Sequence, residues 1–335
     1  MERVTIIVGI YNSSEFLNRG LESIRNQTWE NLEVLLMDDG STDSSSEICD
    51  SFSNMDKRFI SIHKKNSGVC DSRNRGLELA TGEYVCFMDG DDWLETDFIE
   101  YMMKLIHDTS TLMAFSDKLF TTHDRIQSEN DNIETWSSEK AISRIIYPYM
   151  SLGPWNKIYS MKLINEYNIR FPSHWFGETL HFASTVAFYA GRVGVGHRKV
   201  YDYRLDNVNS GTTQFNVDTR LLSLDNCLNL QKCIFSNNTK ISRAIKWHLH
   251  ACYFTLLVNI IGTDSVDKYR DKYNESLKYI KKNGFNVFIY SDVTAKEKIR
   301  ILVRTLFPVT YAKRIARKAN NRLRKLSSPT NTSKL

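Results

Sequence analysis

Three aspartates and one glycine follow directly after an apolar run, in the order Asp89-Gly90-Asp91-Asp92. Three carboxylates within four residues repel one another, and the repulsion costs stability unless a cation lies among them. Carboxylate oxygens are ligands that Mg²⁺ and Mn²⁺ prefer, and these ions link proteins to substrate phosphates. The segment therefore predicts a divalent-metal site, although a solvated acidic turn that caps the next helix could have the same sequence.

A second acidic segment, Asp38-Asp39-Gly40-Ser41-Thr42-Asp43, ends another apolar run. A carboxylate here can accept a hydrogen bond from an imide N–H, such as the one on a uracil ring. Turns also prefer Asp, Gly and Ser, so a turn followed by a helix cap is the alternative. Further along, Arg73 can reach a diphosphate as a bidentate donor, whereas Arg75 fits an exposed helical position better.

The elements that must position these residues alternate between strands and helices. Short apolar runs predict strands at residues 4–10, 32–37, 59–63 and 84–88. Apolar residues at helical spacing lie between these runs, and four such units indicate a mostly parallel α/β sheet. Ligands of these sheets bind beyond the carboxyl ends of the strands, which is where both acidic segments fall.

After residue 110 the pattern is mixed. We expect strands at residues 112–115 and 196–204 with helices between them, and a helical region from residue 216 onward. No run of roughly 18 or more apolar residues occurs, so we expect no membrane-spanning helix. The chain starts almost directly with a strand-like run, and we expect no signal peptide.

The composition is that of a folded globular protein, with 335 residues of which 41% are hydrophobic and 25% charged. The 6 cysteines form no Cys-x-x-Cys pair and no Cys/His spacing typical of zinc ligands. This pattern predicts reduced thiols in a cytoplasmic protein, without a structural zinc or a disulfide framework.

Taken together and in order, these segments resemble the family 2 glycosyltransferases of GT-A fold. The motifs that carry the resemblance are Val8-Gly9-Ile10-Tyr11-Asn12, Asp38 to Asp43, Asn66-Ser67-Gly68 with Arg73-Asn74, Gly82-Glu83-Tyr84, and Asp89 to Asp92. The similarity continues more weakly through Trp155-Asn156-Lys157 and Tyr203-Arg204 to Ser210-Gly211-Thr212. Gly9 is a departure, because the family usually has proline there.

The resemblance implies a GT-A (Rossmann-like) domain with a mostly parallel sheet, followed by a helical C-terminal region. Residues 1–110 would form the nucleotide-sugar half of that domain and residues 111–215 the acceptor half. A helical region would follow at residues 216–297, and a basic amphipathic tail that associates with a membrane at residues 298–335.

The resemblance also implies roles for single residues. The donor would be a nucleotide-sugar, most often a UDP-sugar, bound by Tyr11, Asn12, Asp39, Arg73 and Asp89. Asp91 would be the main ligand of Mn²⁺ or Mg²⁺, with Asp89 and Asp92 supporting it. Such a cation stabilises the negative charge that the leaving nucleoside diphosphate gains as the anomeric bond breaks.

The catalytic base is less well marked. In the family it is the aspartate of a Gly-Glu-Asp-x-x-Phe-like segment, and the corresponding segment here is Gly177-Glu178-Thr179-Leu180-His181-Phe182. A threonine hydroxyl cannot serve as a base near neutral pH, and a positioned base contributes roughly 10²–10⁴-fold in rate. We expect Glu178 to take the role; His181 or His174, or a chain that transfers sugar poorly or not at all, are the alternatives.

Aromatic side chains could bind an acceptor sugar. We expect Trp155, Trp175 and His181 on the acceptor side, with a place in the hydrophobic core as the alternative for Trp155 and a core or surface histidine as the alternative for His181. In the tail, ten Lys or Arg and no Asp or Glu lie between residues 298 and 325, interleaved with apolar residues at helical spacing. This pattern predicts contact with an anionic membrane surface; a solvated helix face is the alternative. No recognition motif accompanies the charge, so we expect no nucleic-acid partner.

The sequence thus predicts an inverting, metal-dependent glycosyltransferase, peripheral on the inner face of a bacterial cell membrane. It would extend a lipid-linked oligosaccharide for a capsule or another surface polysaccharide. A catalytically impaired homologue that binds nucleotide or acceptor as an assembly partner is the alternative, because of Thr179. A nucleotidyltransferase is disfavoured because no glycine-rich basic loop follows the first strand, and a glycosidase because only the clustered aspartates could flank a bond.

Overall fold

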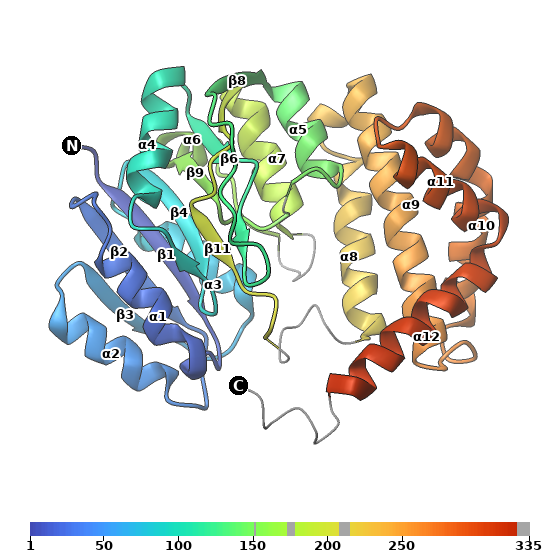
Figure 1. Ribbon diagram of the computed structural model, residues 1–335, viewed down its shortest axis with the longest axis horizontal. Coiled ribbons are helices and arrows are strands. Elements are labelled where there is room, and N and C mark those ends of the chain that lie inside the picture. Colours follow the sequence, from blue (N-terminus) through green and yellow to red (C-terminus); the bar gives the residue numbers. More distant parts are fainter. Residues whose placement is uncertain (151, 173–177, 208–214, 327–335) are drawn as a thin grey trace. The chain divides into compact units, whose positions relative to one another are not determined.

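The computed structural model describes residues 1–150, 152–172, 178–207 and 215–326 (Figure 1). The chain divides into two compact units, Met1–Asn207 and Val208–Leu335. The expected halves 1–110 and 111–215 fall mainly in the first unit, because strands from both halves pair in a single sheet. This unit ends at Asn207, before the expected boundary at residue 215.

The first seven elements follow the predicted alternation of strand and helix. They are β1 (Val4–Ile10), α1 (Ser14–Arg25), β2 (Leu32–Asp38), α2 (Ser45–Met55), β3 (Phe59–His63), α3 (Val69–Leu79) and β4 (Tyr84–Asp89). The four predicted strands are confirmed. Their apolar runs are nearly continuous because a parallel strand in this position is covered on both faces.

The rest of the first unit is more irregular. Its elements are β5 (Trp93–Leu94), α4 (Phe98–Thr109), β6 (Met113–Ser116), β7 (Phe120–Thr121), β8 (Glu134–Ser137), α5 (Ser138–Ile146), β9 (Lys157–Ser160), α6 (Met161–Glu166), α7 (Glu178–Ala190), β10 (Arg192–Gly196) and β11 (Tyr201–Tyr203). The single strand predicted at residues 196–204 is wrong, because β10 and β11 belong to different sheets. Between them the backbone N–H of Lys199 donates to the side chain of Gln127 (2.8 Å) instead of to a neighbouring strand.

Eight strands form the main sheet, in the order β3-β2-β1-β4-β9-β6-β10-β8. The pairs β1–β2, β1–β4, β2–β3 and β6–β10 are parallel, whereas β9 and β8 run antiparallel to their neighbours. The order reverses at β1, since β2 and β3 extend the sheet on one side and β4 on the other. Such a reversal is the place where open α/β sheets bind ligands.

The two faces of β1 pack against different helices. Val4, Ile6 and Val8 join a buried cluster with residues of α1, α2 and α4, and Figure 1 shows α1 and α2 side by side. Ile7 points to the opposite face, where a Cβ at Gly76 of α3 would lie 2.6 Å from its side chain. A glycine therefore lets α3 approach the strand closely, which brings the start of α3 to the sheet edge.

A second sheet of three short strands, β5-β11-β7, lies within the first unit. Tyr201 of β11 pairs with Leu94 of β5, and Asp202 pairs with Trp93. Because β5 begins directly after the acidic segment 89–92, this pairing brings residues that follow β11 next to that segment. The small sheet is thus the element that supports the acidic turn (residues 89–92).

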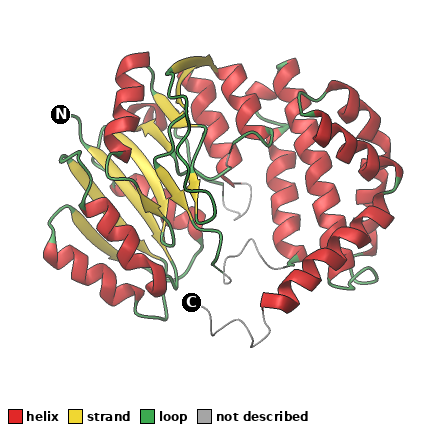
Figure 2. Ribbon diagram, viewed as in Figure 1, coloured by secondary structure: helices red, strands yellow, loops and turns green. Residues whose placement is uncertain are grey.

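The second unit is helical in its described part, as Figure 2 shows. Its elements are α8 (Val217–Leu230), the short 3-10 helix η1 (Ile234–Asn237), α9 (Thr239–Gly262), α10 (Arg270–Tyr290), α11 (Ala295–Leu306) and α12 (Pro308–Leu326). Helix α9 packs against α8, α10 and α12. Helices α11 and α12, which contain the expected tail up to residue 326, pack against α10 and α9, and the membrane association of this tail stays a prediction. Among the described helices none combines the length and apolar character needed to cross a bilayer.

Candidate active site

The carboxyl ends of β1, β2 and β4 meet at one edge of the main sheet. In the parallel register Ile10 lies opposite Asp38, and Gly9 lies opposite Asp89. The loops that follow these strands therefore start side by side at the point where the strand order reverses. The structure thus brings together Tyr11, Asn12, Asp39 and the acidic turn, as the sequence predicts.

The loop after β1 is fastened to the loop after β2 through Asn12. This residue has a positive φ of 49°, a conformation that asparagine tolerates better than most residues. Its backbone N–H donates to Oγ of Ser41 (3.0 Å), and its Oδ1 accepts from the backbone N–H of Thr42 (2.7 Å). The preceding Tyr11 is left 52% exposed, so its ring is accessible to a ligand.

Asp38, by contrast, is buried, and its carboxylate supports the loop after β2 through hydrogen bonds. Its Oδ1 accepts from the backbone N–H of Ser41 (3.0 Å), and its Oδ2 lies 2.6 Å from Oγ of Ser46 and 2.8 Å from Nδ1 of His63. Burial opposes ionisation of Asp38, but hydrogen bonds from these three residues lower the pKa of its carboxyl. The same contact, together with Asp50, raises the pKa of His63.

Asp39 connects the loop after β2 to the start of α3. Its Oδ1 accepts from the ammonium group of Lys64 and from the backbone N–H of Ser67 (2.9 Å), and its Oδ2 accepts from the backbone N–H of Gly68 (2.8 Å). A carboxylate has about four lone-pair positions, so three donors leave one acceptor position. The predicted contact of Asp39 with a nucleotide base stays a prediction.

Arg73 extends from α3 to the acidic turn. Its Nη2 lies 2.9 Å from Oδ1 of Asp89, and its guanidinium lies 5.4 Å from the ring centroid of Phe171. The arginine is buried, whereas the side chain of Asp89 is 32% exposed. The ion pair orients Asp89 and offsets part of the negative charge of the turn. Contact of Arg73 with a diphosphate, as the resemblance implies, stays a prediction.

Asp91 lies at the centre of the acidic turn. Its Oδ2 accepts from the side-chain amide of Asn207 (2.8 Å), and its backbone carbonyl accepts from Nε of Arg204 (2.8 Å). Burial, and then the charge of Asp89, raise the pKa of Asp91. A divalent cation at this position would reverse both effects, because it favours the ionised carboxylates.

Asp92 has a different environment from its neighbour. It is 1% exposed; its Oδ2 accepts from the hydroxyl of Tyr201 (2.7 Å), and its Oδ1 accepts from the backbone N–H of Arg204 (2.9 Å). Burial, followed by the charges of Asp89 and Asp91, raises the pKa of Asp92 well above its usual range. Both of its oxygens accept hydrogen bonds from the protein, so Asp92 positions the turn, and its part as a metal ligand stays a prediction.

The remaining donor set suits a hard divalent cation. Asp89 and Asp91 offer carboxylate oxygens, which are the ligands that Mg²⁺ and Mn²⁺ take in phosphate-binding sites. Burial and the charge of Asp89 raise the pKa of Asp91, and a cation bound there would favour the ionised carboxylate. These residues therefore fit the cation that the resemblance implies.

Three residues near the acidic turn had no predicted role. They come from the end of the first unit and are Tyr201, Arg204 and Asn207. Besides its bonds to the turn, Arg204 places its guanidinium 4.2 Å from the ring centroid of Phe16 and 5.1 Å from that of Trp93. In the sequence, only the Tyr203-Arg204 pair drew attention to this region, as part of the weaker similarity to the family. That similarity did not indicate which residues either side chain contacts.

Trp155 lies in the hydrophobic core, so the core alternative describes it and the acceptor-side prediction is corrected. Its indole stacks on Tyr201 (4.9 Å between centroids, 12° between planes) and on Tyr203 (4.8 Å, 21°). The ammonium group of the buried Lys157 donates to the carbonyl of Gly153 (2.7 Å), and burial lowers the pKa of Lys157 to about 7. The segment 153–157 therefore supports β11, whose Tyr201 bonds to Asp92.

The predicted base lies at the start of a helix. Glu178 is the first residue of α7, but its side chain lies outside the described part of the structure. Thr179 is buried. His181 is partly buried, and burial lowers its pKa. Trp175 and His174 lie outside the described residues, as does the segment 210–212, so these predictions stay open.

Comparison with known proteins gives the family. The model of "Glycosyl transferase family 2" matches residues 5–165. The chain is 31% identical over 210 residues to the putative glycosyltransferase EpsH of Bacillus subtilis, covering 60% of each protein. It is 32% identical over 178 residues to an uncharacterized glycosyltransferase of Haemophilus influenzae, covering 52% of this chain and 67% of that protein.

Solved structures share the fold. The structure of TarS residues 1–349 from S. aureus, in complex with UDP-GlcNAc, has a TM-score of 0.66 at 18% identity, with 96% of this chain and 92% of that chain covered. The mannosyltransferase PcManGT from Pyrobaculum calidifontis, in complex with GDP-Man and Mn²⁺, has a TM-score of 0.53 at 15% identity, with 92% and 88% covered. At these identities the likeness concerns the fold alone.

The mostly parallel sheet with its acidic turn at the switch point defines an α/β protein of GT-A fold. The chain belongs to glycosyl transferase family 2. It spans 60% of the length of EpsH and 31% of that of the pneumococcal glycosyltransferase GlyA. The predictions of fold and family are confirmed, and the reaction itself is a matter for proposal.

Proposed function

We propose that this protein is a metal-dependent glycosyltransferase that moves a sugar from a UDP-sugar to an acceptor hydroxyl with inversion. The observation that carries the proposal is the position of Asp91, which lies at the switch point of the sheet in the same loop cluster as the exposed Tyr11. The complex of TarS with UDP-GlcNAc supports the class of donor, since that protein shares the fold.

We assign different roles to the residues of the acidic turn and to those that contact it. Asp91 and Asp89 would hold Mn²⁺ or Mg²⁺, and the complex of PcManGT with Mn²⁺ supports this class of cation. When bound, the cation stabilises the charge on the leaving nucleoside diphosphate as a Lewis acid. Arg73 keeps Asp89 in place, and Asn207 keeps Asp91 in place. Tyr11 would contact the base, with Asp39 and Asn12 beside it.

A single displacement with inversion needs a base on the acceptor side. We assign this role to Glu178, because it begins α7 directly before Thr179, which stands where the family has its aspartate. Thr179 is buried, so its hydroxyl is not available to an acceptor. The second candidate function rests on the same threonine: a homologue without effective turnover that binds nucleotide or acceptor for a partner enzyme.

The acceptor would be a lipid-linked saccharide of a bacterial surface polysaccharide, reached from the inner face of the membrane. The second unit offers two features that support membrane contact. Exposed apolar side chains lie on α10, α11 and the residue after α11; they are Phe285, Ile289, Tyr290, Ile299, Leu306 and Phe307, and we call them the apolar set. Exposed lysines such as Lys296 lie on the same helices, and helices that carry both cations and exposed apolar side chains are typical of surfaces that bind anionic lipid.

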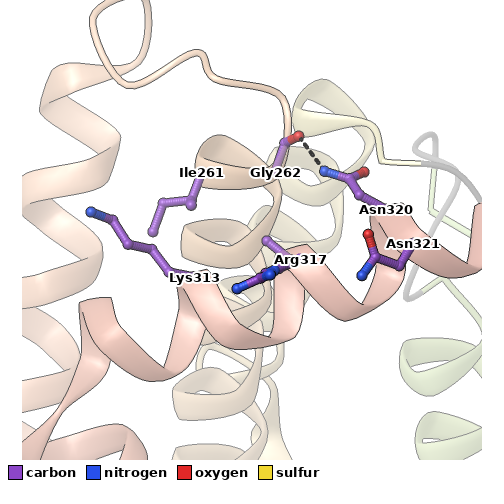
Figure 3. A pocket seen from close by; sticks show the side chains of 7 residues that line it. Ile261, Gly262, Lys313, Arg317, Asn320 and Asn321 are labelled. Carbon is purple, nitrogen blue, oxygen red and sulfur yellow. Dashed lines mark hydrogen bonds between the residues drawn. The ribbon is translucent and has the colours of Figure 1, made fainter.

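The second feature is a hollow where α12 passes the end of α9 (Figure 3). Lys313 and Arg317 of α12 line it together with Asn320, whose side-chain amide donates to the carbonyl of Gly262 (3.3 Å). Two cations and amide groups provide donors for a phosphate. We therefore propose that the hollow takes the headgroup phosphate of an anionic lipid.

A donor screen that measures UDP release in the presence of Mn²⁺ and lipid-linked acceptors tests the reaction. We expect turnover by the unmodified protein, and a loss on the order of 10²–10⁴-fold in Glu178→Gln if Glu178 is the base. Absence of turnover with every donor and acceptor, together with retained UDP binding, would favour the second candidate function. A rate increase in Thr179→Asp would then show that the site has lost the base of its family.

A further inference from the structure

Two cysteines and a histidine come together within the second unit. Cys227 lies on α8, and His248 and Cys252 lie on α9. One possible ligand atom of each residue, two sulfurs and one imidazole nitrogen, lies within 4.8 Å of the other two. Cys252 is the centre of the group, because it lies next to Cys227, His248 and Ser223.

The packing of the two helices explains why these residues meet. His248 and Cys252 are four residues apart in α9, so they share one face of the helix. The backbone N–H of Asn216, at the start of α8, donates to Oδ1 of Asn259, near the end of α9 (3.0 Å). From this bond the two helices run antiparallel. Cys227 follows Asn216 by as many residues as His248 precedes Asn259, so Cys227 and His248 lie opposite each other.

We propose that Cys227, His248 and Cys252 form a binding site for Zn²⁺ that joins α8 to α9. Two thiolates and one imidazole are a borderline-soft donor set, which zinc prefers over the oxygen sites of Mg²⁺ or Mn²⁺. Each thiol releases its proton to solvent on binding, so the two thiolates balance both charges of the cation. The proposal is independent of the proposed function, because it uses no residue of the candidate active site.

The geometry requires only a small contraction. Zn–S and Zn–N bonds of about 2.3 and 2.0 Å place neighbouring ligand atoms roughly 3.3–3.8 Å apart in a tetrahedron. The present separations are at most 4.8 Å, so the ligand atoms would have to approach one another by about 1 Å or less to reach this range. The hydroxyl of Ser223, which already contacts Cys252, or a water molecule would occupy the fourth position. The guanidinium of Arg220 also interacts electrostatically with Cys252 and lies at the edge of the site.

The sequence alone does not give this site. Its cysteines are far apart along the chain, and a His-x-x-x-Cys spacing is not a usual zinc motif. The expectation of reduced thiols without a structural zinc rests on sequence spacing alone. The packing of α8 against α9 adds Cys227 to the pair His248 and Cys252, which spacing does not reveal. A disulfide between Cys227 and Cys252 is the competing use of the same two sulfurs.

Titration of the full, reduced, chelator-treated protein with Co²⁺ tests the proposal, because thiolate-bound cobalt has a sulfur-to-metal charge-transfer absorption that carboxylate-bound cobalt lacks. We expect one equivalent to produce this absorption and Zn²⁺ to displace it. His248→Gln and Cys252→Ser should weaken binding by more than about 100-fold, since loss of an outer partner alone costs 10–100-fold. Cys233→Ser, which removes a cysteine outside the cluster, and Asp91→Asn should leave the absorption unchanged.

Two further measurements keep the outcome clear. Far-ultraviolet circular dichroism shows whether each variant is folded, and His248→Gln keeps both thiols if Cys252→Ser does not fold. For the unmodified protein we expect Zn²⁺ to raise the melting temperature and a chelator to reverse the rise. No thiolate absorption with the reduced protein, the same absorption in both ligand variants, or protein that carries a Cys227–Cys252 disulfide and binds no cobalt after reduction would overturn the proposal.

Discussion

The hydroxyl of Tyr201 donates a hydrogen bond of 2.7 Å to Oδ2 of Asp92 and thereby joins the acidic turn to β11. The same hydroxyl accepts from the backbone N–H of Asp89 at 3.4 Å, so one tyrosine contacts both ends of the turn. Trp155 stacks on the ring of this tyrosine from a third segment of the chain. A buried tyrosine therefore supports the turn that carries the proposed cation ligands.

The first prediction concerns this tyrosine. Tyr201→Phe removes one of the two donors to a buried carboxyl, which we expect to cost about 1–3 kcal/mol of the free energy of unfolding. Mn²⁺-dependent binding of UDP should weaken as well, because Asp89 and Asp91 lose their support. Chemical denaturation and a UDP titration measure the two effects. Tyr203→Phe on the same strand is the matched control, and equal effects of both substitutions would contradict this account.

A second prediction tests the packing behind the turn. A Cβ at Gly153 would lie 2.0 Å from Cε2 of Trp155, so Gly153→Ala must displace the indole. We expect a loss of about 1–3 kcal/mol in the free energy of unfolding, which is typical of overpacking. Gly9→Ala is the control, because its nearest contact would be an ordinary 3.8 Å. A smaller effect at residue 153 than at residue 9 would show that the indole is not confined.

The bond between Asp38 and His63 predicts a dependence of stability on pH. The folded-state pKa of His63 is raised, so its contribution is complete below its unfolded pKa of about 6.5 and is lost as pH rises through the folded value. The pKa of Asp38 is lowered, so its contribution is present above its unfolded value of about 3.9 and is lost as pH falls through the folded value.

The pair is therefore expected to stabilise the fold most between these two limits. His63→Asn should lose roughly 0.5–1 kcal/mol near pH 5.5, since the imidazole is partly exposed, and less near pH 9. Urea unfolding at both pH values gives the difference, with His123→Asn, at an exposed histidine after β7, as the control. A loss that grows with pH would have the wrong sign for this pair.

The fourth prediction concerns the membrane surface. Deleting residues 298–335 would remove the buried side chains of Ile301, Ala312 and Ala316 and uncover the parts of α9 and α10 that α11 and α12 pack against, so point substitutions are the better test. Replacing both Ile299 and Phe307 with serine should weaken binding to vesicles that contain anionic lipid by at least about 10-fold, because two apolar side chains no longer enter the interface.

The control for the vesicle experiment lies in the other unit. Ile126 is 80% exposed and outside the apolar set, so Ile126→Ser should leave vesicle binding unchanged. Binding of the unmodified protein should also fall as salt rises, since Lys313 and other cations contribute to the attraction. Binding that is the same for the double variant and the unmodified protein would remove the apolar set from the account.

The sequence predicts the parts of the site that lie on regular elements. Asp39 follows β2 and Asp89 ends β4, and these two parallel strands lie on either side of β1, so both residues reach the same edge of the sheet. Tyr201 and Asn207 could not be found in this way, because their contact with the turn depends on the short β5–β11 pairing between distant segments. The split of the strand expected at residues 196–204 has the same cause.

Local patterns also fail where burial decides the role of a residue. From the sequence, Trp155 cannot be distinguished from a tryptophan that binds sugar. Only its stacking on Tyr201 and Tyr203 shows that it belongs to the core. In the sequence Asp92 resembles the nearby Asp89 and Asp91, yet its side chain is buried although it is only one residue further along the turn than Asp91. Such differences depend on packing, which spacing along the chain does not contain.

Calorimetric titration of UDP in the presence of Mn²⁺ tests the central claim most directly, when the unmodified protein is compared with Asp91→Asn. The account predicts binding by the unmodified protein that a chelator abolishes, and loss of that metal-dependent binding in Asp91→Asn. Asp108→Asn, which removes an exposed carboxylate from α4, should bind as tightly as the unmodified protein. Equal, metal-dependent affinity of Asp91→Asn and the unmodified protein would contradict the assignment of the acidic turn.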